Sequence, residues 1–97
     1  MEKPSGKQVR ALRGLGHHLH PVVMIGRGEL SDAVIASVEE ALNAHELIKI
    51  KLQEGCDMDR REVAAALAEA CSANVVQVLG KTILLYRPGD PPVIELP

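Results

Sequence analysis

The stretch PVVMIGRGELSDAV, from Pro21 to Val34, contains an apolar segment, a glycine-rich segment and a predicted helix start, in that order. An unbroken apolar run, Pro21–Ile25, leads into two glycines around Arg27, and Ser31 then has a side chain that typically begins a helix. The apolar run is short and rich in β-branched residues, so we expect a strand that is buried on both faces. A strand that turns directly into a helix indicates an α/β protein.

Three helices are predicted along the chain. Ser5 and Gln8 form a capping box that opens the first helix, and two glycines weaken its end. The second helix begins after Ser31 and ends near Asn43, and the third begins at Asp59. Their apolar residues recur at helical spacing, which indicates one buried side and one solvated side for each helix.

Three further strands are predicted. Leu47–Leu52 alternates apolar and basic residues, as expected for a strand. The runs VVQVL and TILLY flank Gly80 and Lys81, which form a two-residue hairpin with glycine first. The last residues, 89–97, are a proline-broken tail with a short extended piece at 93–96.

The order of elements is therefore helix, strand, helix, strand, helix, strand, strand. Helical crossovers make the first three strands parallel, and the hairpin makes the last strand antiparallel. We expect a two-layer α/β sandwich with three helices and a mixed four-stranded sheet. The 97 residues form a single domain, with a core at about residues 7–88.

The core must be aliphatic, because the chain contains no Phe or Trp and its one tyrosine is Tyr86. No apolar run has the length of a membrane span, and the N-terminal residues lack the pattern of a signal peptide. Cys56 and Cys71 do not have the spacing of a metal site, so we expect reduced thiols and a cytoplasmic protein.

The net charge of −2 is unevenly distributed along the sequence. Residues 1–28 contain five Lys or Arg and one Glu, whereas the remainder has six basic and twelve acidic residues. A local basic patch can therefore attract an anionic partner although the whole chain is weakly acidic. Lys7, Arg10 and Arg13 recur at three-residue steps, roughly opposite the apolar side of the first helix.

Two interpretations of the glycine loop stay open on the spacing alone. The loop is a plain turn between strand and helix, or its backbone N–H groups approach a phosphate. Arg27 favours phosphate, and Glu29 disfavours it. Lys49 and Lys51 extend a basic surface only if their side of the sheet is open, and the basic stripe of the first helix is otherwise a solvated face.

No catalytic or metal site is predicted. His17, His18 and His20 are close in sequence, but no carboxylate or cysteine at ligand spacing accompanies them. The serines lack the surroundings of a nucleophile, and two of them are helix caps. We therefore expect no cofactor, no small-molecule substrate and no enzymatic activity.

Three segments follow one another along the chain: KQVRALRGLGHHLHPVVMIGRGEL, ALNAHELIKIKL and VVQVLGKTILLYRP. Together they resemble the CRM domain (chloroplast RNA splicing and ribosome maturation) family in its stand-alone bacterial YhbY-like form. The resemblance covers about residues 7–88 and implies a fold similar to the C-terminal domain of bacterial translation initiation factor three. It also implies an RNA-binding protein that associates with precursors of the large ribosomal subunit.

The resemblance implies a G-x-x-G loop that contacts RNA together with nearby basic residues. Gly26 matches the first glycine, and Glu29 stands where the second glycine is usual. Arg27 and Gly28 fill the two variable positions between them. The basic residues that match are Lys7, Arg10, Arg13, Lys49, Lys81 and Arg87.

A chain with one tyrosine cannot stack RNA bases on a set of aromatic rings, so we expect binding through phosphates and RNA shape. The expected partner is ribosomal RNA in precursors of the large subunit, bound by a monomer and away from membranes. Two other classes stay open: an adaptor that binds proteins through an exposed apolar patch, and a small phosphatase of the acylphosphatase kind.

Overall fold

Helices and strands alternate along the chain in the predicted order. The computed structural model describes residues 3–26, 30–56 and 58–97. In chain order the elements are α1 (Gly6–His17), β1 (Pro21–Ile25), α2 (Asp32–His45), β2 (Leu47–Leu52), α3 (Arg60–Cys71), β3 (Asn74–Leu79) and β4 (Thr82–Tyr86). Ser5, Ser31 and Asp59 cap the three helices as predicted. None of the helices in these ranges is both long and apolar enough to cross a membrane.

The strands form one mixed sheet in the order β1-β2-β4-β3. β1 is parallel to β2, and β4 is antiparallel to both of its neighbours. Gly80 begins the β3–β4 turn with a φ of +58°, the left-handed conformation that the first position of a tight hairpin requires. The predicted α/β class, the order of elements and the antiparallel last strand are confirmed.

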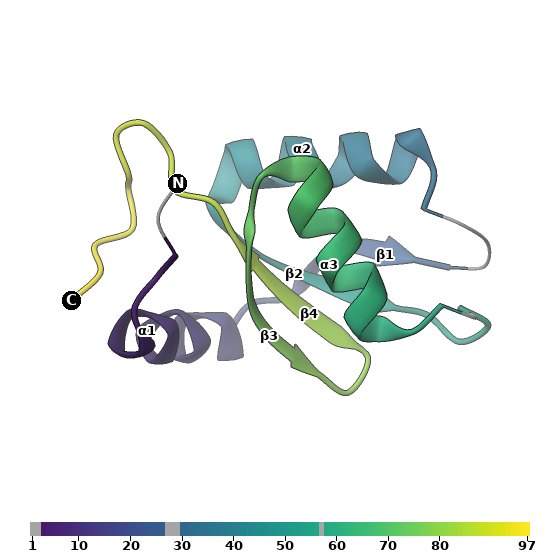
Figure 1. Ribbon diagram of the computed structural model, residues 1–97, viewed down its shortest axis with the longest axis horizontal. Helices are drawn as coiled ribbons and strands as arrows, with labels where there is room; N and C mark the ends of the chain where they lie inside the picture. The colour runs from purple at the N-terminus through teal and green to yellow at the C-terminus, as the bar shows by residue number, and fades with distance from the viewer. Residues whose placement is uncertain (1–2, 27–29, 57) are drawn as a thin grey trace.

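α2 and α3 lie together on one face of the sheet (Figure 1). Their apolar sides pack on the strand residues that point to this face, and each such side chain stabilises the fold by about 1.5–3 kcal/mol when buried. The most deeply buried side chains of this core are Val38, Leu42, Ile48, Ile50, Val63, Leu67, Ile83 and Leu85. All of them are aliphatic, as the composition requires.

α1 packs on the opposite face of the sheet (Figure 1). Leu12 is fully buried in a second cluster with Leu47 and Leu84, which alternate along their strands with residues of the first core. Gly16 lies so close to the sheet that a Cβ atom there would be 2.5 Å from Leu84 Cδ1. Helices therefore cover both faces, whereas the predicted two-layer sandwich has them on one. An amphipathic pattern does not say which face a helix covers, and this part of the arrangement could not be predicted.

The side of the molecule that includes α1 is referred to below as the α1 face: the outward surface of α1 and the sheet surface on which α1 packs. α1 leaves β1, an edge strand, bare on this face. Val22 and Met24 of β1 are 52% and 56% exposed, whereas Val23 and Ile25 are buried toward the other core. The prediction that β1 is buried on both faces is wrong, because α1 packs over β2, β3 and β4.

The tail, residues 89–97, is fastened to the end of α2. Glu46 follows α2 with a φ of +59°, and its buried carboxylate accepts hydrogen bonds from the backbone N–H groups of Gly89, Val93 and Ile94. Ile94 and Leu96 pack against the Leu12 cluster. The predicted extended piece at 93–96 forms no strand, because Glu46 and not a neighbouring strand satisfies its backbone.

Candidate nucleic-acid interface

The bare part of the α1 face carries two lysines of β2. Lys49 and Lys51 alternate with the buried side chains of Ile48, Ile50 and Leu52, so the pleat of the strand directs both lysines to the α1 face. Lys51 is exposed and Lys49 is half-buried. This side of the sheet is therefore open, as the two lysines require in order to extend a basic surface.

The three basic side chains of α1 point in two directions, toward solvent and toward β3. Lys7 and Arg10 lie opposite Leu12 and are exposed to solvent. Arg13 lies at the side of the helix, where its Nε donates a hydrogen bond of 3.3 Å to the carbonyl oxygen of Val76 in β3. In the part of the chain that the structure describes, Lys7 and Arg10 have no hydrogen-bond or ion-pair partner for their side chains. Both charges are therefore available to an anionic ligand.

Gly26, the first residue of the predicted glycine loop, follows β1 at the far end of the sheet. The backbone N–H of Gln53 donates to the carbonyl oxygen of Ile25 at 2.8 Å, and a Cβ atom on Gly26 would be 3.1 Å from Gln53 Oε1. The N–H of Leu52 donates to the carbonyl oxygen of Lys81 at 2.7 Å, which brings the β3–β4 hairpin to the same end. Gly26 and Lys81 thus share one end of the sheet. The other predicted loop residues, Arg27, Gly28 and Glu29, lie outside the described residues.

α1 and Gly26, which follows the end of β1, lie at opposite ends of the α1 face. In Figure 1, β1 begins near the end of α1 and points away from it. The sheet surface that carries Val22, Met24, Lys49 and Lys51 lies between them. The predicted basic residues of α1 and β2 are therefore arranged along a strip and are not gathered around Gly26.

The elements that build the α1 face contain no acidic residue. α1 and the four strands carry Lys7, Arg10, Arg13, Lys49 and Lys51 and no Asp or Glu. α2 and α3, on the other face, carry five acidic residues and two arginines. The fold thus separates positive from negative charge across the sheet, although the net charge is only −2.

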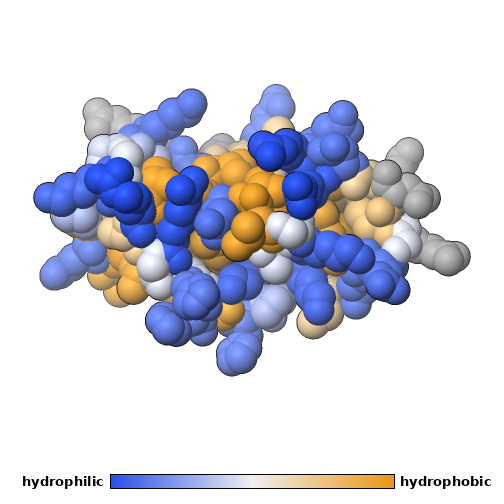
Figure 2. Space-filling view, turned by 90° about the horizontal axis from the view of Figure 1, so that it is seen from below, coloured by the Kyte–Doolittle hydropathy of each residue, from blue (hydrophilic) through white to orange (hydrophobic). Residues whose placement is uncertain are grey.

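An apolar patch occupies the middle of the α1 face, bordered by hydrophilic side chains (Figure 2). The large apolar side chains exposed on the elements of this face are Leu15, Val22, Met24 and Leu79, at 48%, 52%, 56% and 64%. Exposed apolar patches often mark binding surfaces. The patch could not be predicted from the sequence, because an edge strand and a central strand have the same apolar pattern.

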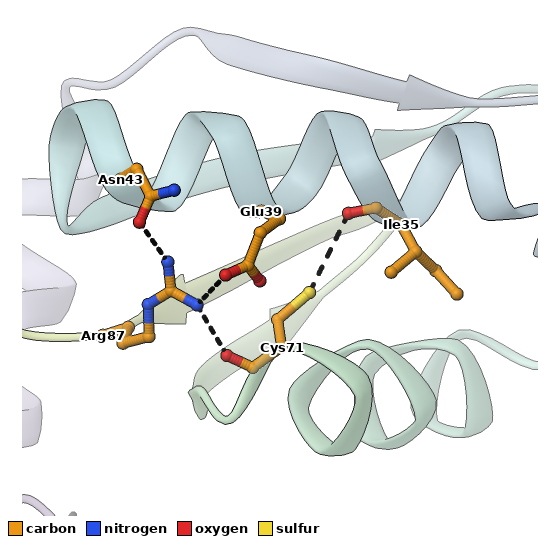
Figure 3. Close-up of polar contacts among 5 residues, drawn as sticks. All are labelled: Ile35, Glu39, Asn43, Cys71 and Arg87. Atoms are coloured by element: carbon orange, nitrogen blue, oxygen red, sulfur yellow. Dashed lines mark hydrogen bonds and ion pairs between the residues drawn. The ribbon is translucent and has the colours of Figure 1, made fainter.

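Arg87, predicted to contact RNA, has different surroundings (Figure 3). Its guanidinium donates to Glu39 Oε1 at 2.7 Å, to Asn43 Oδ1 at 2.7 Å and to the carbonyl oxygen of Cys71 at 2.8 Å. The side chain is 18% exposed and joins the end of β4 to α2 and α3. Arg87 is therefore not brought together with the cations of the α1 face. Burial raises the pKa of the nearby Cys71 thiol, and Glu39 raises it further, so the thiol stays protonated.

Lys81 and the histidines complete the inventory of predicted side chains. Lys81 forms an exposed ion pair with Glu54, in which Nζ and Oε1 are 3.9 Å apart. Such pairs contribute about 0–1 kcal/mol, so Lys81 can exchange this partner for a phosphate. Within residues 3–26, 30–56 and 58–97, no group of three or more His, Cys, Asp or Glu side chains is placed to hold a metal ion.

Fold and surface together define a small α/β domain with one basic, partly apolar face. The CRS1 / YhbY (CRM) domain matches residues 5–87 of the chain. "Probable RNA-binding protein YqeI" of Bacillus subtilis is 42% identical over 94 residues, which cover 96% of this chain and 98% of that protein. An "RNA-binding protein" of Haemophilus influenzae is 44% identical over 94 residues, which cover 96% and 94%. The chain belongs to the CRS1 / YhbY (CRM) domain family.

A solved structure shows the same fold. The solution structure of a hypothetical protein from Staphylococcus aureus matches with a TM-score of 0.82 and 36% identity, covering 98% of this chain and 100% of that one. The family predicted from the three sequence segments is thereby confirmed. The assignment of individual residues to RNA contact stays a prediction.

Proposed function

We propose that the chain binds RNA through the α1 face, chiefly by contacts to phosphates. The proposed target is ribosomal RNA in precursors of the large subunit, and the role is assembly in the cytoplasm, without catalysis. The relatives in Bacillus subtilis and Haemophilus influenzae are named as RNA-binding proteins. Because they cover nearly the whole chain, they support the same class of ligand here.

The observation that carries the proposal is the separation of charge across the sheet. Lys7, Arg10, Lys49 and Lys51 project from elements that contain no acidic residue. A phosphate backbone laid along this strip meets cations, with Glu54 as an acidic neighbour at the Lys51 end, whereas on the α2 and α3 side it meets five acidic residues. The strip is therefore the favourable side for a polyanion.

Stacking on Phe, Trp or Tyr rings does not contribute to this surface. Tyr86 is the only aromatic residue of the Phe, Trp and Tyr class, and it is 5% exposed within the cluster under α1. Affinity for RNA must then come largely from charge. This contribution weakens as salt rises, because the counterions that binding releases then gain less entropy. A strong dependence on salt is the consequence.

The exposed apolar patch favours a second candidate, an adaptor that binds a protein through the same face. Leu15, Val22 and Met24 give it the apolar surface that such contacts need. The two candidates differ in their response to salt. Apolar contacts persist as salt rises, whereas phosphate contacts are lost.

The test is a filter-binding titration of the full chain with a structured hairpin of large-subunit ribosomal RNA at increasing salt. We expect the affinity to fall at least about tenfold between roughly 50 and 200 mM salt, as about three to five neutralised phosphates require. An affinity that does not change with salt would contradict phosphate binding and favour the adaptor.

Two exposed arginines supply a matched control for this titration. Arg10→Gln removes a cation from the α1 face, so it should weaken binding and reduce the salt slope by about one. Arg61→Gln removes a cation from α3 on the other face, so it should change neither. Equal effects of the two variants would show that only the overall charge matters.

A further inference from the structure

A hollow of about 410 Å³ opens on the α1 face, beside the C-terminal part of α1. Its volume lies within the range of small-ligand sites in proteins, about 300–1,000 Å³. The walls are mostly aliphatic and come from α1, the turn after it, β1, β2 and the tail: Leu15, Leu19, Val22, Leu47 and Ile94. Such walls suit a flat, apolar group.

The polar groups of the hollow are few and carry no negative charge. His20, His45 and Lys49 are the polar side chains among its lining residues, and none of the lining residues is acidic. Glu46 is close in sequence to this lining, but its oxygens accept hydrogen bonds from the backbone of the tail. The hollow therefore combines apolar walls with hydrogen-bonding imidazoles and a cation.

We propose that this hollow binds one unstacked nucleobase of the RNA held by the α1 face, an inference that rests on the proposed function. A base that leaves its stack presents apolar ring faces and a polar edge. Leu15 and Val22 contact the ring, the imidazoles bond with the edge, and Lys49 neutralises the phosphate of the same nucleotide. The site gives a chain without exposed Phe, Trp or Tyr rings a way to recognise single-stranded nucleotides beside a helix.

Charge favours a nucleotide over an apolar side chain of a protein as the occupant. Lys49 is half-buried at the hollow, and Lys51 follows it on the same side of β2. An apolar protein segment gains nothing from these cations, whereas each nucleotide brings one phosphate with its base. The hollow and the cationic strip are continuous parts of one face and serve one ligand.

The experiment compares Val22→Ala with Val75→Ala on two RNAs that carry equal numbers of phosphates. Val75 is a matched control, because it is 41% exposed on a sheet-edge strand, but it pairs with Leu85, whose side chain belongs to the opposite core. The first RNA is a hairpin with an unpaired loop, and the second is a fully paired duplex. We expect Val22→Ala to weaken hairpin binding about fivefold and to leave duplex binding unchanged. This loss of affinity is smaller than the loss caused by removing an aromatic residue on which a base stacks.

A second variant guards against a change in the fold of β1. Leu15→Ala alters the hollow from α1, where alanine favours the helix, and it should weaken hairpin binding in the same way. Val75→Ala should bind both RNAs as the unaltered chain does. If Val22→Ala and Leu15→Ala bind the hairpin normally, the hollow does not hold a base and is left for a protein side chain. An unaltered chain that binds neither RNA contradicts the proposed function itself.

Discussion

At the scale of single residues, position decides what an arginine can do. Arg10 and Arg87 both match basic positions around the motifs of the family. Arg10 has no side-chain partner in the described part of the chain, whereas three acceptors on α2 and α3 hold the Arg87 guanidinium. A free guanidinium can meet a phosphate, but one with its donors engaged holds helices together.

Arg87→Met should therefore reduce stability without reducing RNA affinity. It removes charge-assisted hydrogen bonds to Glu39, Asn43 and the Cys71 carbonyl, so we expect the free energy of unfolding to fall by about 1.5–3 kcal/mol. Urea unfolding measures this change, and filter binding measures affinity well below the melting temperature. Normal stability with weakened binding would instead make Arg87 an RNA contact.

Glu46 joins the tail to α2 through a charge. Burial by itself raises the pKa of this carboxyl group, but hydrogen bonds from the backbone of Ile94, Val93 and Gly89 outweigh burial and hold the pKa below its ordinary value. A carboxylate whose pKa is lower in the folded than in the unfolded chain stabilises the fold above the unfolded value. That stabilisation is lost as the pH falls through the folded value.

Glu46→Gln should remove this dependence on pH. At neutral pH the variant loses one oxygen that accepts from two backbone N–H groups, and we expect it to be less stable by about 1–3 kcal/mol. The gap between the two proteins should close in acid, where the glutamate is protonated. Urea unfolding from neutral pH to about pH 3 measures the gap, and a gap that stays constant would contradict the account.

At the scale of elements, α1 is placed by two glycines with different surroundings. A Cβ atom at Gly16 would meet Leu84, which is 3% exposed and packed in the Leu12 cluster. A Cβ atom at Gly14 would meet no heavy atom within 4 Å among the described residues. One glycine therefore permits the close packing of α1 on the sheet, and the other only lowers the helix propensity.

Replacement by alanine should therefore change stability in opposite directions at Gly14 and at Gly16. Gly14→Ala should stabilise the protein by about 0.5–1 kcal/mol through helix propensity alone. Gly16→Ala gains the same propensity but forces Leu84 to move, and we expect a net loss of about 1–2 kcal/mol. Thermal melting of the pair decides the point. Two stabilised variants would show that α1 does not pack tightly on Leu84.

At the scale of the whole molecule, local signals could predict the elements but not their partners in space. Ser5, Ser31 and Asp59 cap helices because capping depends on neighbouring backbone groups alone. The exposure of Val22 depends on β1 being an edge strand that α1 does not cover, and no short pattern encodes that. Arg87 lies far along the sequence from Glu39, so its ion pair could not be predicted either.

Strand alternation predicted part of the candidate interface. The alternation of Leu47–Leu52 places Lys49 and Lys51 on one side, but whether that side is open depends on where α1 packs. The apolar hollow needs the same information, because its walls come from segments that are distant in sequence. The family resemblance predicted the class of ligand, and the fold adds the face that would hold it.

The central claim is that RNA lies along the α1 face. Its most direct test is a nuclear magnetic resonance titration of the nitrogen-15-labelled chain with the ribosomal RNA hairpin. We expect the backbone signals of α1, β1, Lys49 and Lys51 to shift on binding, together with those of Gly26 and Lys81. Signals on the outward sides of α2 and α3 should stay in place. Shifts that are confined to α2 and α3, with α1 and β1 unchanged, would contradict the claim.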